Sequence, residues 1–138
     1  MIQRILVAYD GSKPSEKAFE FGLDIARKYG AEMIVLSVAR PPEPAEVVET
    51  EAVLESAKEY YERHFAELRE KASAAGVSPK FDVVVGHPAA QIVHAANDRG
   101  VDLVVMGHTG KSLVQRWLLG SVSKRVLSYA HCTVAVVR

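Results

Sequence analysis

Glycine and serine recur at short intervals between Gly107 and Ser123. Two residues separate Gly107 from Gly110, and nine separate Gly110 from Gly120, which Ser121 follows. Glycines let a backbone approach a polyphosphate closely, and successive N–H groups in such turns form a concavity that binds anions. A helix that begins near Ser121 would add N–H groups without partners inside the helix. The segment is therefore a candidate phosphate site, although a turn before a capped helix uses the same residue types.

Two better-known phosphate motifs do not fit the chain. Gly110-Lys111-Ser112 ends like a Walker A loop, but the first glycine of that pattern would fall at position 105, which is Val105. The dinucleotide fingerprint G-x-G-x-x-G is absent after the first apolar run, where Asp10-Gly11-Ser12 stands. Lys111 still adds a positive charge, and no acidic residue follows Asp102. This C-terminal part of the chain suits an anionic ligand.

Composition narrows the class of protein. The 138 residues suit a single domain over 1–138, and 17 basic residues balance 17 acidic ones, which argues against a dedicated nucleic-acid binder. The one cysteine, Cys132, excludes an internal disulfide, and no cysteine–histidine cluster indicates a metal site. The apolar runs are shorter than the roughly 18 residues that span a bilayer, and a secretory signal pattern is absent. We expect a cytoplasmic protein that binds neither membranes nor nucleic acid.

The elements that would position these residues alternate along the chain. Apolar runs predict strands at 5–9, 33–38, 81–85, 101–106 and 133–137, and the 81–85 strand, which alternates, is expected near a sheet edge. Helical periodicity predicts helices at 14–29, 46–75, 89–99 and 121–130. This alternation predicts an α/β fold with three layers, in which a doubly wound parallel sheet has helices on both faces.

Each of the first two predicted helices has one apolar face. In the first helix the face comprises Ala18, Phe21, Gly22, Ile25, Ala26 and Tyr29. In the second it comprises Val53, Ala57, Tyr61, His64, Leu68 and Ala72. Ligands of doubly wound sheets bind beyond the carboxyl ends of the strands, where the strand order reverses. Asp10-Gly11-Ser12 and the segment that begins at Gly107 both follow such ends.

The glycine spacing resembles that of a known family. Gly107-x2-Gly110-x9-Gly120-Ser121 is similar to the G-2x-G-9x-G-[S/T] pattern of the ATP-binding branch of the universal stress protein family. The likeness covers the whole chain, including its opening strand and turn, its fourth strand and its C-terminal end. Two positions depart from the family: Thr133, where proline is frequent, and His108, where small or basic residues are frequent.

This resemblance implies a five-stranded sheet with the order 3-2-1-4-5 and a site for ATP. Asp10 would hold the adenosine part and could contact Mg²⁺, while Ala8 and Val38 would border the adenine. Gly107 would pass close to the ribose and phosphates. The triphosphate would be surrounded by Gly110, Gly120 and Ser121, with His108, Thr109, Lys111, Val122 and Ser123 as neighbours. The motif does not separate ATP from ADP or AMP.

The resemblance also implies a homodimer. The last strand, which consists of Thr133, Val134, Ala135, Val136 and Val137, would pair across a two-fold axis. Its terminal position and apolar pattern fit an edge that another chain covers. The alternative is a strand buried within the monomer.

No catalytic set is evident. A nucleophile needs a positioned base, and the five histidines are scattered over different elements. We therefore expect a regulatory or stress-response protein that works through nucleotide occupancy and dimer contacts, with at most slow ATP hydrolysis. The alternatives are a nucleotidyl-transferring enzyme on the same fold and a nucleotide-free interaction module in which the glycines only shape a turn.

Overall fold

Helices and strands alternate along the chain as the sequence predicts. The computed structural model describes residues 1–41, 47–109 and 120–138. Within these residues the chain forms, in order, β1 (Arg4–Ala8), α1 (Lys13–Tyr29), β2 (Glu32–Ala39), α2 (Val47–Ala74), β3 (Lys80–Val85), α3 (Pro88–Asp98), β4 (Leu103–Gly107), α4 (Ser121–Tyr129) and β5 (Thr133–Val137).

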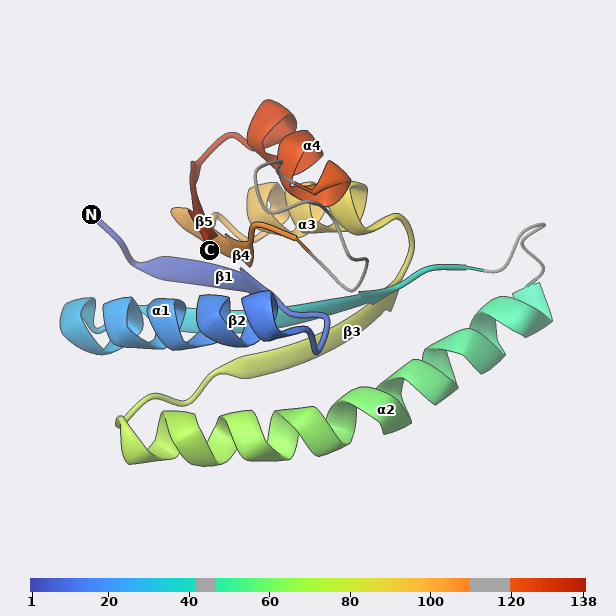
Figure 1. The fold of residues 1–138 in the computed structure, drawn as a ribbon, viewed down its shortest axis with the longest axis horizontal. Coiled ribbons are helices and arrows are strands. Elements are labelled where there is room, and N and C mark those ends of the chain that lie inside the picture. Colours follow the sequence, from blue (N-terminus) through green and yellow to red (C-terminus); the bar gives the residue numbers. More distant parts are fainter. Residues whose placement is uncertain (42–46, 110–119) are drawn as a thin grey trace.

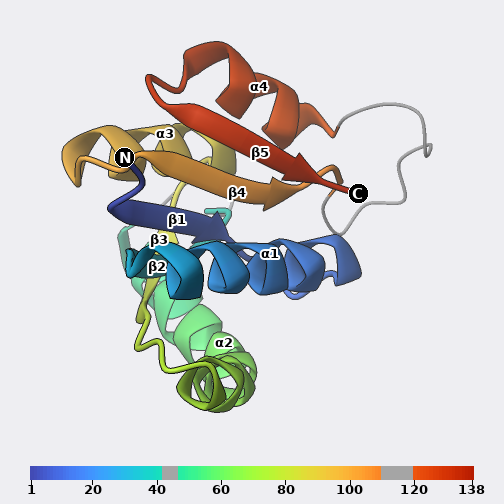
Figure 2. The ribbon, with the colours of Figure 1, turned by 90° about the vertical axis from the view of Figure 1, so that its left-hand side faces the viewer.

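The strands form one parallel sheet with the order β3-β2-β1-β4-β5 (Figure 1). α1 and α2 lie on one face of this sheet, and α3 and α4 lie on the other (Figure 2). The predicted three-layer fold is confirmed, as is the position of β3 at an edge. The order reverses between β1 and β4, so chain segments leave these two strands in opposite directions.

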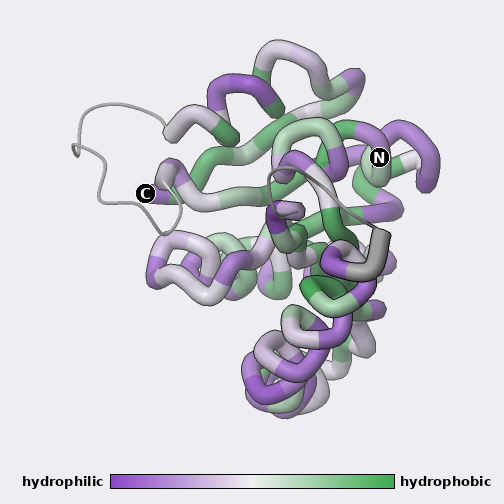
Figure 3. Tube along the Cα trace, turned by 90° about the vertical axis from the view of Figure 1, so that its right-hand side faces the viewer, coloured by the Kyte–Doolittle hydropathy of each residue, from purple (hydrophilic) through white to green (hydrophobic). Residues whose placement is uncertain are grey.

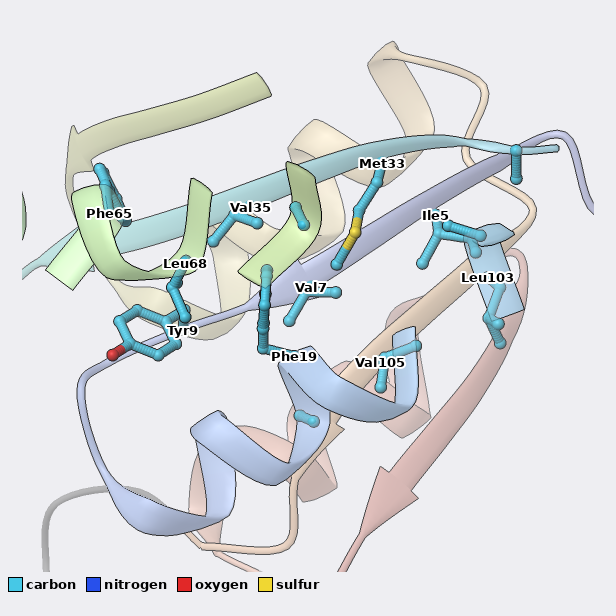
Figure 4. Close-up of a cluster of buried hydrophobic side chains, with 14 of the residues drawn as sticks. Ile5, Val7, Tyr9, Phe19, Met33, Val35, Phe65, Leu68, Leu103 and Val105 are labelled. Atoms are coloured by element: carbon cyan, nitrogen blue, oxygen red, sulfur yellow. The ribbon is translucent and has the colours of Figure 1, made fainter. Parts of the chain in front are cut away.

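Alternate side chains of each strand enter two hydrophobic cores. On the α1–α2 face, Val7 packs in one cluster with Phe19 and Phe65 (Figure 4). On the opposite face, Leu6 packs in a second cluster with Ile92. Figure 3 shows the strands as largely hydrophobic segments inside the molecule and the outer helical turns as largely hydrophilic. Burying each large apolar side chain contributes about 1.5–3 kcal/mol, which holds both helical layers on the sheet.

α1 approaches the sheet closely because its inner face is small. A Cβ added to Gly22 would lie 2.7 Å from Cγ2 of Val7, so a larger residue would push the helix away. The predicted apolar face of this helix is partly wrong. Phe21 and Tyr29 are 45% and 56% exposed, whereas Phe19 is fully buried. The true inner stripe runs along positions 15, 18, 19, 22 and 26, which follows the helical period more closely.

β4 starts two residues later than predicted. Asp102 precedes the strand, and its carboxylate accepts hydrogen bonds from the N–H groups of Gln3 (2.8 Å) and Arg4 (2.9 Å). Its own N–H donates to the carbonyl of Arg4 at 3.0 Å. The side chain of Asp102 thus connects the start of β4 to the start of β1. The regular hydrogen bonding of the strand begins at the next residue, Leu103.

α2 combines a charged surface with a narrow buried stripe. Tyr61, Phe65, Leu68 and Ala72 are each at most 4% exposed. The N-terminal part of this helix extends past the carboxyl ends of the strands (Figure 1). No helix in the described part of the chain is long and apolar enough to cross a membrane.

Candidate functional site

A cavity of about 680 Å³ lies at the carboxyl ends of β1, β2 and β4, where the strand order reverses. This is the position at which doubly wound sheets bind their ligands, and the volume is typical of small-molecule sites. Nine of the residues predicted for the site contribute to its wall. They are Ala8, Asp10, Val38, Gly107, Thr109, Gly120, Ser121, Val122 and Ser123.

Of the other three predicted residues, only His108 is described by the structure, and it does not line this wall. Gly110 and Lys111 lie outside the residues that the structure describes. His108 connects three elements through its backbone, because its N–H donates to the carbonyl of Val137 (2.9 Å) and its carbonyl accepts from the N–H of Gly120 (2.7 Å). Its Nδ1 is buried and has no hydrogen-bond partner among the described residues.

The start of α4 opens onto the cavity without a side-chain cap. Its N-cap residue is Gly120, and the first hydrogen bond within the helix runs from the N–H of Lys124 to the carbonyl of Gly120. In the described part of the chain, the N–H groups of Ser121, Val122 and Ser123 have no acceptor. Unpaired donors at a helix start, together with the helix dipole, favour an anion.

The start of α1 borders the same cavity but is closed. The hydroxyl of Ser12 accepts a hydrogen bond from the N–H of Ser15 at 3.3 Å. The hydroxyl of Ser15 in turn donates to the carbonyl of Ser12 at 2.8 Å, and Pro14 has no N–H to offer. At the start of α1 the N–H groups of Ser15 and Glu16 are thus both used within the turn, whereas at the start of α4 three consecutive N–H groups have no acceptor among the described residues.

Ser123 holds α4 against the end of β4. Its hydroxyl, which is buried, donates to the carbonyl of Gly107 at 2.9 Å and lies 3.4 Å from that of His108. A serine hydroxyl carries one proton, so this proton is not available to a ligand. The side chain of Ser123 thus positions the helix start, whereas its backbone N–H remains a candidate donor.

Gly107 is required by the protein's own packing. A Cβ at this position would lie 2.6 Å from Cβ of Pro14 and 2.8 Å from its carbonyl carbon, distances that real Cβ atoms do not show. The first turn of α1 therefore rests directly on the end of β4. The absent side chain also leaves the backbone of Gly107 in the cavity wall.

Val38 presents peptide groups to the space beyond the end of β1. The carbonyl of Ala39 accepts from the N–H of Gly86 on the β3 side, at 2.9 Å. Because peptide groups alternate in direction along a strand, those of Val38 face the β1 side, where β1 has already ended at Ala8. A neighbouring donor and acceptor of this kind match the hydrogen-bonding edge of a nucleobase.

Asp10 follows β1, which lies between β2 and β4 in the sheet. It therefore lies between the peptide groups of Val38 and the start of α4. One carboxylate oxygen accepts from the N–H of Ser12 at 2.9 Å, which fixes the orientation of the side chain. Burial, and secondly the charge of Asp10, raise the pKa of Tyr61 to about 12. Among the described residues, no group of three acidic, histidine or cysteine side chains could hold a metal ion. A Mg²⁺ ion at Asp10 would therefore need ligand phosphates to complete its coordination.

The sequence motifs did not predict the wall of the cavity that α2 forms. α2 contributes Ser56, Ala57, Tyr60 and Tyr61, and Arg40 lies exposed at the end of β2. The periodicity of α2 places Tyr61 on its inner stripe but indicates nothing about a ligand. The spacing of four between Ser56 and Tyr60, which puts both on one face, is the only local signal for this wall.

The strand order and the cleft define a doubly wound α/β protein with a cavity at its switch point. The model of the universal stress protein family matches residues 1–138, and the chain belongs to this family. It is 34% identical over 142 residues to a universal stress protein of Methanocaldococcus jannaschii, and the match covers 100% of this chain and 83% of that one.

Two solved structures of universal stress proteins share this fold. The universal stress protein UspA from Lactobacillus plantarum superposes with a TM-score of 0.87 at 24% identity, and the alignment covers 99% of this chain and 97% of that one. A universal stress protein in complex with cAMP has a TM-score of 0.77 and 26% identity, with 99% and 97% covered. The first likeness concerns the fold alone, and the second comes from a relative that binds a nucleotide.

Proposed function

We propose that the cavity binds ATP and that the protein acts as a regulatory, stress-response protein through nucleotide occupancy. The observation that carries this proposal is the start of α4, which has no side-chain cap and whose first three N–H groups have no acceptor among the described residues, in the wall of a cavity of about 680 Å³. Backbone donors at a helix start bind phosphate without needing a basic side chain. The family relative that binds cAMP supports a nucleotide as the ligand.

The parts of a nucleotide fit the order of the strands. Phosphates at the start of α4 would lie beyond β4, the sugar beyond β1 at Asp10, and the base beyond β2 at Val38. The chain from Leu103 onward contains no acidic residue, so an anion at α4 meets no nearby carboxylate from that stretch. Favourable local potential of this kind strengthens phosphate binding and speeds association.

A single backbone donor can be removed to test this assignment. Ser121 is the first helical residue, where proline is well tolerated, and Gly120 has the extended conformation (ψ 157°) that precedes proline. Ser121→Pro deletes one N–H, and Ser121→Ala removes the same hydroxyl but keeps the N–H. By calorimetry with ATP we expect the proline variant to bind roughly 10- to 100-fold more weakly and the alanine variant to lose much less.

Two results would overturn the proposal. One is the absence of any binding by the unmodified protein at millimolar ATP. The other is equal ATP affinity in the Ser121→Pro variant and the unmodified protein, with circular dichroism confirming that α4 is retained. Parallel titrations with ADP and AMP then assign the contribution of each phosphate.

Nucleotide binding would exert its regulatory effect through the dimer of the protein. β5 lies at an edge of the sheet, and His108 joins its last residue, Val137, to the start of α4. We infer a homodimer formed by β5 strands of two copies, in which the site and the interface share this hydrogen-bonded junction.

A further inference from the structure

The α2 wall places a phenol against the turn that carries Asp10. The hydroxyl oxygen of Tyr60 lies 3.3 Å from the position that a Cβ on Gly11 would occupy. Gly11 itself has φ +83°, a left-handed conformation that glycine adopts without strain. Asp10 and Tyr60 both line the cavity, and the hydroxyl of Tyr60 reaches the turn that follows Asp10 from the opposite element, α2.

The ring of Tyr60 packs against two aromatic neighbours on its own helix. It packs edge-on against Tyr61, with ring centroids 4.9 Å apart and an interplanar angle of 84°, and its centroid lies 5.1 Å from that of His64. His64 is anchored in turn by a 3.0 Å hydrogen bond between its Nδ1 and the hydroxyl of Tyr9. Tyr60 nevertheless remains 48% exposed. A preorganised aromatic group that faces a cavity pays little conformational entropy on contact with a ligand.

The chemistry beside Asp10 matches a pair of neighbouring hydroxyls. A carboxylate only accepts hydrogen bonds, and one oxygen of Asp10 is already bonded to the N–H of Ser12. A phenol can both donate and accept. A ribose offers two adjacent hydroxyls with the same dual capacity, and the sugar of a nucleotide lies between base and phosphate. β1 lies between β2 and β4, so the sugar would be placed at the Asp10 turn.

We propose that Tyr60 is a specificity-determining residue that hydrogen-bonds a ribose hydroxyl of the bound nucleotide and so favours ribonucleotides over deoxyribonucleotides. This inference rests on the proposed function, since it assigns a role within the same site. Asp10 accepts from one hydroxyl of the sugar, and Tyr60 bonds the other.

Calorimetric titration with ATP, 2′-deoxyATP and 3′-deoxyATP tests the assignment in the unmodified protein and in Tyr60→Phe. We expect the unmodified protein to prefer ATP over one of the two deoxy analogues by roughly 2- to 12-fold, the range for one neutral hydrogen bond. Tyr60→Phe should lose that factor for ATP and keep its affinity for that analogue, so the preference disappears. Tyr129→Phe, on the exposed surface of α4 (66% exposed), is the matched control and should behave as the unmodified protein.

The outcomes separate this inference from the proposed function. Equal affinity of the unmodified protein for all three nucleotides would overturn the role of Tyr60 while leaving ATP binding intact. An equal loss of affinity for all three nucleotides in Tyr60→Phe would indicate a packing role and would also overturn it. So would an unchanged affinity for all three. Failure of the unmodified protein to bind any nucleotide would instead overturn the proposed function and this inference with it. Thermal unfolding confirms that the variant is folded.

Discussion

The buried hydroxyl of Ser123 donates a 2.9 Å hydrogen bond to the carbonyl of Gly107, sixteen residues earlier in the chain. This bond fixes the start of α4 relative to the end of β4. It therefore determines where the first N–H groups of the helix lie in the cavity wall. The two residues belong to the same glycine and serine pattern, so that pattern serves the protein's own structure as well as a ligand.

Removing this bond should destabilise the protein. Ser123→Ala leaves the carbonyl of Gly107 without its buried donor, and we expect a loss of about 1–3 kcal/mol in the free energy of unfolding, measured by urea denaturation. Ser128→Ala is the control, because its hydroxyl donates to the carbonyl of Lys124 on the exposed side of the same helix at 2.9 Å. A similar loss in both variants would contradict the role given to Ser123.

Gly107→Ala should separate α1 from β4. The new Cβ would meet backbone and ring atoms of Pro14 within 3.0 Å, and these atoms cannot rotate away. Overpacking of this kind costs about 1–3 kcal/mol, seen as a lower midpoint of thermal unfolding. In Gly86→Ala the nearest atoms belong to the flexible side chain of Gln91, so we expect a smaller effect. Equal effects in the two variants would count against the close contact between α1 and β4.

Asp102 should contribute stability that depends on pH. Hydrogen bonds from the N–H groups of Gln3 and then Arg4 lower the pKa of this carboxyl below its ordinary value. Between the folded and the unfolded pKa the unfolded state binds more protons, so stability rises with pH. The contribution is present above about pH 3.9 and is lost as the pH falls through the folded pKa.

Asp102→Asn tests this dependence. The variant should be less stable than the unmodified protein at neutral pH, and the difference should narrow below about pH 3, measured by denaturant titration at both pH values. Asp98→Asn, at an exposed position at the end of α3, is the comparison. A difference of the same size at both pH values would show that the charge of Asp102 is not the cause.

The proposed dimer depends on one side of β5. The carbonyl of Val137 accepts from the N–H of His108, so the peptide groups of Val137 face β4 and those of Val136 face outward. Val136→Pro removes an outward N–H without breaking the ladder to β4. We expect this variant to be monomeric by light scattering and Val136→Ala to remain dimeric. A proline variant as dimeric as the unmodified protein would place the interface elsewhere.

Much of the fold could be predicted because burial on both faces leaves continuous apolar runs in β1 and β4. The same reasoning failed for α1, where Phe21 and Tyr29 are apolar but exposed. Periodicity shows only which residues are apolar. The face of α1 that contacts the sheet is the one with small residues, because these let the helix approach the strands closely. The apolar pattern also predicted the start of β4 too early. Asp102 lies within the predicted strand, but its side chain accepts hydrogen bonds from the backbone of the residues before β1 and at its start.

The sequence by itself determined the order of strands and helices and the spacing of Gly107, Gly120 and Ser121, because both are local properties of the chain. It also placed Asp10 directly after a strand. Only the tertiary structure decided that α4 starts uncapped while α1 is capped, and that the hydroxyl of Ser123 belongs to the backbone of Gly107. It alone brought Tyr60 to the Asp10 turn, because packing of α2 on the sheet joins residues about fifty positions apart, and no local pattern encodes such a contact.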